Sequence, residues 1–278
     1  MASTAPTLPL NDNHTIPAIG YGTGHLTDDN APDLVPFALE CGYRLLDTAA
    51  RYDNEVGVGR GVRESSIDRS EIIVTTKLRG SEHGRESARQ ALEGSLTRLG
   101  LDYVDLYLIH WPLPRIDKYV ESWETMIAMR DEGLIRSIGV SNFNPEHIDR
   151  LERETGVLPA ANQIERHLEW PQTEQLAYHA ERGIVTQAWS PLRLAGPILD
   201  SSTVTSIATH HGVNSGQVAL RWHVQSGVVP IPHSTSRERI AGNFDVFSFE
   251  LSDEEMGSLA KLDSGDRMGG DPLTHEEF

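Results

Sequence analysis

Eight short apolar runs, separated by longer stretches with helical patterns, constrain the fold of this 278-residue chain more than any other feature. The runs span residues 18–22, 43–47, 72–77, 104–110, 135–140, 160–165, 184–189 and 228–232. The helical patterns lie between and after them, at residues 32–41, 54–64, 85–99, 119–132, 145–155, 173–182, 215–225 and 237–244. Several patterns stop at or near a glycine, which adopts the left-handed conformation of a helix end at the least cost. Strands that alternate with helices through short connections indicate parallel βα units.

The segments outside this alternation also carry recognisable patterns. Residues 7–22 alternate apolar and polar positions around a polar turn, which predicts a small hairpin before the first barrel strand. Residues 202–211 predict an additional helix, and a capping-box pattern at 252–255 opens a C-terminal helix. Residues 264–278, rich in glycine and acidic side chains, are expected to form a surface tail. Because no low-complexity linker interrupts the chain, we expect one domain over residues 1–278.

Titratable side chains stand where the second, third and fourth runs end. Asp47 closes the second run and Tyr52 follows in the loop beyond it, Lys77 closes the third run, and His110 closes the fourth. In a barrel of parallel strands these ends converge on one face, where such enzymes carry out their chemistry. Each residue alone has an ordinary structural explanation, such as a helix cap or a packing contact. Their common position at successive strand ends favours a catalytic site.

The reduction of a carbonyl group suits these four side chains. Hydride delivery to a carbonyl carbon leaves negative charge on the oxygen, so a proton donor must face that oxygen. Tyr52 is the candidate acid, but a free tyrosine has a pKa near ~10 and donates slowly around neutrality. A lysine ammonium beside the phenol, here Lys77, lowers that pKa, and Asp47 orients the ammonium. His110 is expected to hydrogen-bond the carbonyl oxygen.

The motifs around these residues resemble those of the aldo-keto reductases. They are the DTAxxYxNE pattern at residues 47–55, the TTK triplet at 75–77 and the IHWP run at 109–112. The likeness extends over nearly the whole chain and implies a (β/α)8 TIM barrel whose bottom is closed by the N-terminal hairpin. It also implies NAD(P)H-dependent reduction of aldehydes and ketones. The ending at 271–277 is similar to that of the bacterial 2,5-diketo-D-gluconate reductases, so keto sugars or keto acids are expected substrates.

The cofactor site is likewise implied by the resemblance. No GxGxxG motif follows a strand, and the glycine-rich stretch at 57–61 lies within a helical pattern, so a Rossmann-type phosphate loop is not expected. The resemblance implies that Ser141, Asn142 and Gln163 contact the nicotinamide carboxamide. Trp189 is expected to stack on the nicotinamide ring. The pyrophosphate loop and the adenosine 2'-phosphate site are expected at Ser190, Pro191, Leu192, His233, Ser234, Thr235, Arg239 and Asn243.

Two positions depart from the family pattern at the expected adenosine and 2'-phosphate site: His233, and Gly242, which stands where an acidic residue is common. The family usually has lysine where this chain has His233, and histidine is mostly neutral at pH 7. Attraction for a 2'-phosphate is therefore expected to be weaker, although the Ser234 hydroxyl and the Arg239 guanidinium remain. We expect NADPH to be preferred, with some use of NADH.

The substrate pocket is predicted from residues near the catalytic candidates. Trp111 is expected to wall the pocket, and Gly24 stands where related reductases often carry an aromatic or apolar residue. If His25, Arg51 or Arg79 faces the site, a carboxylated or polyhydroxylated carbonyl substrate is favoured, because arginine pairs with carboxylate through two hydrogen bonds. The alternative is that both arginines are solvated.

Composition and charge narrow the partners and the compartment. With 24 basic and 41 acidic residues the formal charge is −17, which opposes non-specific binding to nucleic acid or an anionic membrane. Cys41 is the one cysteine, so no internal disulfide can form, and the first residues have no signal-peptide pattern. No apolar run approaches the ~18 residues of a membrane helix. We expect a cytoplasmic protein and, by analogy with the family, a monomer.

Two other functional classes fit parts of the sequence. A cofactor-binding regulatory or scaffold subunit without significant turnover shares the fold, but it does not need all four catalytic-type residues. A metal-dependent barrel hydrolase would use Asp and His at strand ends, yet the sequence has no cluster with ligand spacing. His210 and His211 are adjacent on a predicted helix, where neighbouring side chains are expected to diverge. We therefore expect no metal site.

Overall fold

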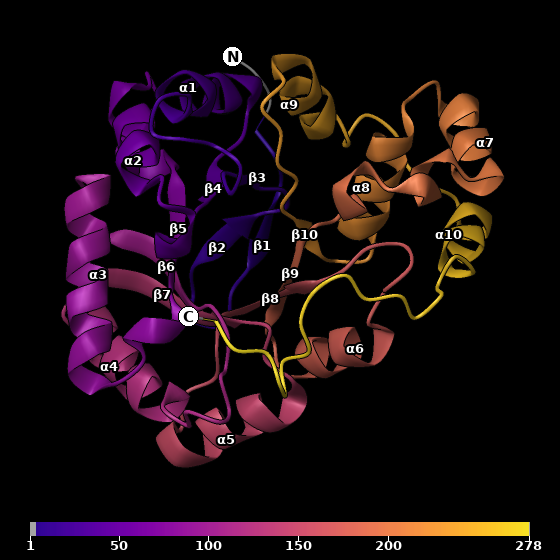
Figure 1. Ribbon diagram of the computed structural model, residues 1–278. Helices are drawn as coiled ribbons and strands as arrows, with labels where there is room; N and C mark the ends of the chain where they lie inside the picture. The colour runs from indigo at the N-terminus through magenta and orange to yellow at the C-terminus, as the bar shows by residue number, and fades with distance from the viewer. Residues whose placement is uncertain (1–3, 278) are drawn as a thin grey trace.

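Eight parallel strands form the centre of the computed structural model, which describes residues 4–277 (Figure 1). Each strand pairs in parallel with the next one along the chain. In chain order they are β3 (Tyr21–Gly22), β4 (Leu45–Asp47), β5 (Ile73–Leu78), β6 (Val104–Ile109), β7 (Ile135–Ser141), β8 (Ala161–Glu165), β9 (Val185–Trp189) and β10 (Val229–Pro230). All eight predicted runs contain strands, although the first, second and last strands are at least two residues shorter than predicted.

Backbone contacts between the first and last strand segments close the sheet into a barrel. The Gly20 N–H donates to the Pro230 carbonyl at 3.0 Å, and the Gly22 N–H donates to the Pro232 carbonyl at 2.9 Å. A parallel bridge between Gly22 and His233 continues this ladder. The predicted (β/α)8 TIM barrel is therefore confirmed, and the carboxyl ends of its strands meet at one face.

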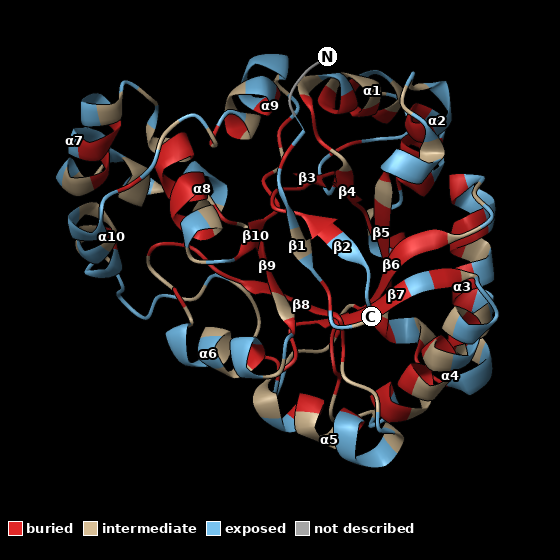
Figure 2. Cartoon of the chain, turned by 180° about the vertical axis from the view of Figure 1, so that it is seen from behind, coloured by how far each residue is buried: buried red, intermediate tan, exposed pale blue. Residues whose placement is uncertain are grey.

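Helices surround the strands, with buried inner faces and exposed outer faces (Figure 2). Those of the βα units are α1 (Ala31–Cys41), α2 (Glu55–Glu64), α3 (Arg85–Leu99), α4 (Tyr119–Asp131), α5 (Pro145–Thr155), α6 (Thr173–Glu181), α8 (Ser215–Gln225) and α9 (Arg237–Phe244). Two further predicted helices, α7 (Ser202–His211) and α10 (Asp253–Ala260), pack together at one edge of the ring. Within residues 4–277 no helix is both long and apolar enough to cross a membrane.

The predicted N-terminal hairpin consists of the antiparallel strands β1 (Thr7–Pro9) and β2 (Thr15–Pro17). Figure 2, seen from behind, shows it crossing the barrel at the end opposite the strand carboxyl termini. Ile16, which is 1% exposed, packs in one cluster with Leu45 and Leu108 from the barrel strands. The hairpin therefore fills the bottom of the barrel with apolar side chains, which leaves the opposite end for a site.

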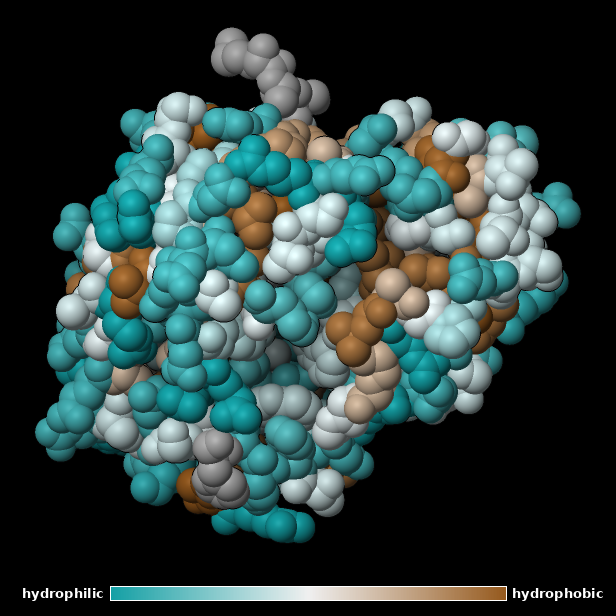
Figure 3. Space-filling view, turned by 45° about the horizontal axis from the view of Figure 1, so that its top comes forward, coloured by the Kyte–Doolittle hydropathy of each residue, from teal (hydrophilic) through white to brown (hydrophobic). Residues whose placement is uncertain are grey.

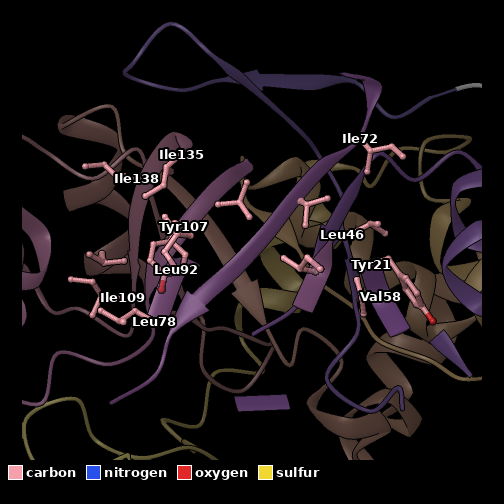
Figure 4. Close-up of a cluster of buried hydrophobic side chains, with 14 of the residues drawn as sticks. Tyr21, Leu46, Val58, Ile72, Leu78, Leu92, Tyr107, Ile109, Ile135 and Ile138 are labelled. Atoms are coloured by element: carbon pink, nitrogen blue, oxygen red, sulfur yellow. The ribbon is translucent and has the colours of Figure 1, made fainter. Parts of the chain in front are cut away.

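Strand side chains alternate between two apolar layers. Leu45 and Leu108 face the barrel interior, whereas Leu46 and Tyr107 belong to the larger cluster between the strands and the helices. Figure 4 shows part of this outer cluster, in which Leu92 of α3 joins strand side chains such as Tyr107. Residues two apart on a strand share a face, so the register of the interior layer determines which polar side chains reach the site.

The C-terminal segment lies on the surface as predicted for most of its length, but its last described residue does not. Residues 264–277, here called the tail segment, are mostly exposed or half-buried, whereas Glu277 is 4% exposed. Figure 1 shows the segment, in yellow, running in front of the strand ends. The Glu165 carboxylate at the end of β8 accepts hydrogen bonds from Met268 N at 2.6 Å and Gly269 N at 2.8 Å. The barrel end thus supplies hydrogen-bonding partners that hold the segment across the strand ends, and the buried Glu277 is held in the same way.

Candidate active site

The pleat of the strands directs the predicted catalytic side chains toward the barrel interior. Asp47 stands two residues after Leu45, which lies in the interior cluster. Thr75 of β5 is paired with Asp47, and Lys77 follows two residues later on the same face. His110 directly follows β6 in the same alternation. Side chains from three neighbouring strands therefore converge at one point of the barrel mouth.

The loop after β4 holds Tyr52 at the same point. Tyr52 ends a single 3-10 turn, Ala50–Tyr52, and the Asn54 side chain fixes the loop around it. Asn54 Nδ2 donates to the Thr23 carbonyl at 2.7 Å, and Asn54 Oδ1 accepts from the Thr48 hydroxyl at 2.8 Å. Because Asn54 is fully buried, this network ties the loop to the segment after β3.

Lys77 is the centre of a buried polar network. Its side chain is 0% exposed, and Nζ lies 2.6 Å from Asp47 Oδ1. Nζ also donates to the Thr48 carbonyl at 2.9 Å and reaches the Tyr52 hydroxyl at 3.5 Å. The second Asp47 oxygen accepts from Gln163 Nε2 at 2.7 Å. All of these groups are satisfied, so the ammonium is held at a defined distance from the phenol.

The pKa values of Tyr52 and Lys77 show which of the two side chains is protonated at neutral pH. Burial raises the pKa of Tyr52, and the nearby Lys77 ammonium opposes this effect without overcoming it. Burial disfavours the Lys77 ammonium, but Asp47 and Tyr52 raise the Lys77 pKa above its ordinary value. The sequence suggested a net decrease for the tyrosine, and burial is the reason for the difference. At neutral pH the phenol therefore holds its proton beside a charged ammonium.

His110 has an acidic neighbour that the sequence did not reveal. Its Nδ1 lies 2.7 Å from Glu277 Oε1, and its ring stands edge-on to the Tyr52 ring with centroids 6.1 Å apart. Burial lowers the pKa of His110, and Glu277 opposes this effect. Burial also disfavours the Glu277 carboxylate, but His110 and the Gly80 N–H hold the Glu277 pKa below its ordinary value. The free protein thus has a neutral imidazole against an ionised carboxylate.

A cavity of about 280 Å³ opens above these side chains. Figure 3 shows a hollow near the middle of the surface on this side of the molecule. Lys77 lies beneath the floor, and the lining combines the other three catalytic candidates with predicted cofactor and substrate residues: Gly24, His25, Asp47, Tyr52, His110, Trp111, Ser141, Asn142, Gln163, Trp189, Ser190 and His233. Gly22 and Ile231 also line it.

Amide side chains form one wall of this cavity. Asn142 adopts a left-handed backbone conformation, with φ of 61°, and donates from Nδ2 to the His110 carbonyl at 3.0 Å. Its Oδ1 accepts from the Trp189 indole N–H at 2.8 Å, and the Ser141 hydroxyl donates to the Gln163 carbonyl at 2.8 Å. The wall thus has hydrogen-bond donors and acceptors next to an indole ring, which suits a flat ring that carries a carboxamide.

A second cavity of about 390 Å³ continues from the first. The two share His25, Ser190 and His233, so they form one extended groove. The other residues that line the second cavity include the remaining predicted pyrophosphate and adenosine residues, and Leu194 and Ala195 were not predicted. They are Pro191, Leu192, Leu194, Ala195, Pro232, Ser234, Thr235, Arg239 and Asn243. A groove with amides at one end and the Arg239 guanidinium at the other fits an extended dinucleotide with a phosphate at its far end.

His233 lies where the two cavities meet. Its ring stacks on His25, with centroids 3.9 Å apart and planes at 25°. Burial lowers the pKa of His233 to about 4, and His25 and Arg239 act in the same direction. His233 is therefore uncharged at neutral pH. Arg239 Nε donates to the Ser234 hydroxyl at 3.2 Å, which places a permanent cation beside it.

The two arginines proposed for substrate binding lie outside both cavities. Arg79 caps a short turn after β5, and Arg51 is 47% exposed with Nε 3.6 Å from Glu277 Oε1. Neither side chain lines the groove. The sequence gave no signal for the contact between Arg51 and Glu277, because the two residues lie far apart along the chain.

The metal-site alternative finds no support at the strand ends. Among residues 4–277, one group has ligand atoms close enough together, namely His210, His211 and Glu255. It joins α7 to α10 on the outside of the ring. The expectation that the two histidines diverge was wrong, because both rings contact Glu255 Oε1, at 2.9 and 3.0 Å. Glu255 also caps α10 through Ser252, so these contacts explain the group as a link between helices.

Comparisons with known proteins agree with this geometry. The aldo/keto reductase family model matches residues 18–264. A 2,5-diketo-D-gluconic acid reductase B from Corynebacterium sp. is 46% identical over 98% of this chain and 99% of the relative. Methylglyoxal reductase DkgA from Escherichia coli is 46% identical over 95% and 96%. The structure of a Bombyx mori aldo-keto reductase in complex with NADP superposes with a TM-score of 0.90 at 38% identity, covering 96% of this chain and 95% of that one.

These findings establish the family and its general chemistry. The family match covers most of the chain, and structural neighbours contain NADP or NADPH. The groove described above fits that cofactor, with amides near Tyr52 and Arg239 at the far end. The chain belongs to the aldo/keto reductase family and is an NAD(P)H-dependent oxidoreductase that reduces carbonyl groups.

Proposed function

We propose that this protein reduces small polar aldehydes and ketones, keto sugars or keto acids such as 2,5-diketo-D-gluconate among them, with Tyr52 as the proton donor. The observation that carries the proposal is the position of the Tyr52 hydroxyl, 3.5 Å from the buried Lys77 ammonium. His110 lines the same cavity. The relatives named above act on 2,5-diketo-D-gluconic acid and on methylglyoxal, both of which are small and carry more than one carbonyl group.

Each side chain has a separate task in the reaction. Bound NADPH supplies the hydride, which leaves negative charge on the substrate oxygen. Tyr52 donates its proton to that oxygen, and the Lys77 ammonium stabilises the phenolate that remains. Asp47 and the Thr48 carbonyl hold the ammonium in place. His110 contributes a hydrogen bond from a ring N–H to the same oxygen, which orients the carbonyl.

The shape of the cavity favours a small polar substrate. A Cβ atom at Gly24 would stand 3.5 Å from the Tyr52 ring, so glycine leaves the space beside the acid open. His25 adds a polar edge on this side, and Trp111, 8% exposed, adds an apolar wall. Because Arg51 and Arg79 lie outside the cavity, recognition rests on hydrogen bonds to carbonyl and hydroxyl groups instead of an arginine pair.

Loss of absorbance from NADPH tests the proposal directly. Purified protein is mixed with NADPH and 2,5-diketo-D-gluconate, methylglyoxal or a neutral aromatic aldehyde, and Tyr52→Phe is compared with wild type. We expect the polar dicarbonyls to have the higher kcat/KM and the variant to lose at least ~100-fold in kcat, the lower range for a general acid. NADPH affinity, followed by fluorescence, should be retained, because the substitution removes only the hydroxyl.

Other outcomes would contradict separate parts of the proposal. Turnover by Tyr52→Phe at the wild-type rate would exclude this tyrosine as the donor. A marked preference for the aromatic aldehyde would exclude the polar substrate class. If wild type binds NADPH and reduces none of a broad carbonyl panel, the protein is instead a cofactor-binding regulatory or scaffold subunit without significant turnover.

We also propose that the protein works in the cytoplasm as a monomer. The support is the single cysteine, Cys41, which allows no internal disulfide, and the formal charge of −17, which disfavours self-association through non-specific contacts. Light scattering after size-exclusion chromatography measures the mass in solution. A mass of twice 30.8 kDa would contradict the monomer.

A further inference from the structure

We propose that Glu277 is a positioning residue for His110, pairing with the Nδ1 side of the ring and stabilising the doubly protonated imidazole when a carbonyl oxygen binds at Nε2. This inference rests on the function proposed above for the site. It adds a residue from the tail segment to a set of side chains that otherwise comes from strand ends and the loop after β4.

The first step of the argument is that Glu277 is built into the barrel mouth. Its side chain is 3% exposed, and Oε2 accepts a hydrogen bond from the Gly80 N–H at 2.9 Å. A Cβ atom at Gly80 would lie 2.0 Å from the Glu277 carbonyl oxygen, so glycine is needed there for the tail to approach. The Trp111 and His275 rings, with centroids 4.0 Å apart, hold the preceding turn of the tail. The carboxylate is therefore fixed in place and does not reach in from solvent.

The second step concerns the remaining oxygen of this carboxylate. Oε1 lies 2.7 Å from His110 Nδ1, whereas its other cationic neighbour, Arg51 Nε, is 3.6 Å away on a side chain that is 47% exposed. Interaction with an exposed arginine is weakened by solvent screening. His110 is thus the neighbour to which Oε1 is most strongly coupled.

The third step concerns which of the two ring nitrogens of histidine carries a proton. A carboxylate beside Nδ1 favours a proton on that nitrogen, so a neutral ring has its lone pair on Nε2 and cannot donate to a carbonyl oxygen there. A second proton on Nε2 turns the ring into a donor, and the carboxylate stabilises the resulting positive charge. The ring takes this proton from solvent when substrate binds. Tyr52 still gives the proton that ends on the product, and no bond to His110 forms or breaks in that step.

Whether the ring can bind this second proton depends on the charges around it. Lys77 opposes it and Asp47 favours it, but those two form an ion pair of their own at 2.6 Å. Tyr52 is uncharged before the reaction, and His83, on the turn after β5, is buried and neutral with a pKa of about 4. Glu277 is therefore the neighbouring charge that most favours the protonated ring, against the effect of burial.

Glu277→Gln provides the test, because glutamine keeps the shape and an oxygen for the Gly80 N–H while it removes the charge. In wild type, kcat/KM is expected to fall with rising pH as the ring loses its second proton. Removal of a carboxylate at contact distance lowers a histidine pKa by at least about one unit, so the variant's profile should shift to lower pH by that amount. At pH 7 the variant should lose about tenfold or more, and the difference should narrow toward acid.

Two controls separate charge from structure. Glu276→Gln removes the neighbouring carboxylate, whose Oε1 lies 3.7 Å from Arg115, and should leave the wild-type profile unchanged. Equal melting temperatures and NADPH affinities for all three proteins would show that the tail segment is intact. A Glu277→Gln profile with an unchanged midpoint, whatever its height, would overturn the proposal.

A spectroscopic measurement does not depend on turnover. Nitrogen NMR of 15N-histidine-labelled protein with NADPH bound should show that the His110 ring gains its second proton at a pH at least about one unit lower in Glu277→Gln than in wild type. An equal titration midpoint in both would overturn the inference even if the enzyme is active. Conversely, if wild type reduces no carbonyl compound, the proposed function fails while this readout still tests the pairing of Glu277 with His110.

Discussion

At the scale of single residues, the surroundings of His233 determine what charge this position carries in place of the lysine that the family usually has. A lysine at this position would bring a permanent charge to the junction of the two cavities. The histidine instead stacks on His25 and has a pKa of about 4, because burial, His25 and Arg239 all disfavour its charged form. Arg239 is then the cation that lines the second cavity. We therefore expect discrimination between NADPH and NADH to depend on fewer charges than the family pattern supplies.

Replacement of this residue predicts a change in cofactor selectivity. His233→Lys should lower the Kd for NADPH about tenfold, since a charged hydrogen bond to phosphate contributes roughly 1.5 kcal/mol or more. The Kd for NADH, which lacks the 2'-phosphate, should change less. Fluorescence titrations with both cofactors measure the ratio, and His233→Gln, which stays neutral, is the matched control. Equal tightening for the two cofactors would contradict the assignment of this position to the 2'-phosphate.

At the scale of elements, the glycines of α2 explain how the helix approaches its neighbours. A Cβ atom at Gly59 would lie 1.9 Å from the Leu99 carbonyl oxygen at the end of α3. Glu55, 1% exposed at the start of α2, accepts from the Thr76 hydroxyl at 2.6 Å and from Arg98 Nε at 2.7 Å. The glycine-rich stretch therefore lets α2 pack closely against its neighbours, which agrees with its helical pattern in the sequence.

A methyl group at this contact should destabilise the whole protein. Gly59→Ala is expected to cost about 2 kcal/mol, because the opposing atom is backbone and cannot move aside as a side chain would. Gly257→Ala in α10 is the control, since no atom lies within 4 Å of its added Cβ and alanine favours a helix by roughly 1 kcal/mol. Thermal unfolding should show a lower midpoint for the first variant and an equal or higher one for the second. Equal midpoints for the two would contradict close packing of α2 on α3.

At the scale of the whole molecule, buried neutral histidines link stability to pH. His179 is 0% exposed, and burial lowers its pKa to about 4. The Asn162 amide nitrogen donates both to the Phe143 carbonyl and toward His179 Nε2 at 3.0 Å, so Nε2 accepts and the ring proton lies on Nδ1, facing the Thr186 hydroxyl at 2.8 Å. A second ring proton would place two donors face to face.

The sign of the pH effect follows from the direction of this shift. Between pH 6.5 and 4 the unfolded chain binds more protons at His179 than the folded protein does, so stability decreases as the pH falls. At pH 4.5 the loss from this one group is about 2 to 3 kcal/mol relative to pH 7. Urea unfolding at the two pH values should show a smaller loss for His179→Gln than for wild type. Parallel behaviour of the two proteins would contradict a neutral, buried His179.

The sequence by itself determined the elements, their order and the residues at strand ends. Apolar runs of strand length and glycines after helical patterns are local signals, and eight strands in a parallel barrel bring Asp47, Lys77 and His110 together because strand ends meet at one face. The register of each strand also follows from local alternation, since Leu45 and Asp47 must share a face.

The tertiary structure decided the contacts between distant segments. Glu277 reaches Gly80, 197 residues away, and stands against His110, while the stacking of His25 on His233 joins the first and eighth strand ends. No local pattern encodes such contacts, because they depend on the closure of the barrel and on which polar groups the mouth leaves for the tail segment. The protonation states at the site follow from the same closure, since burial outweighs the charge of Lys77 at Tyr52.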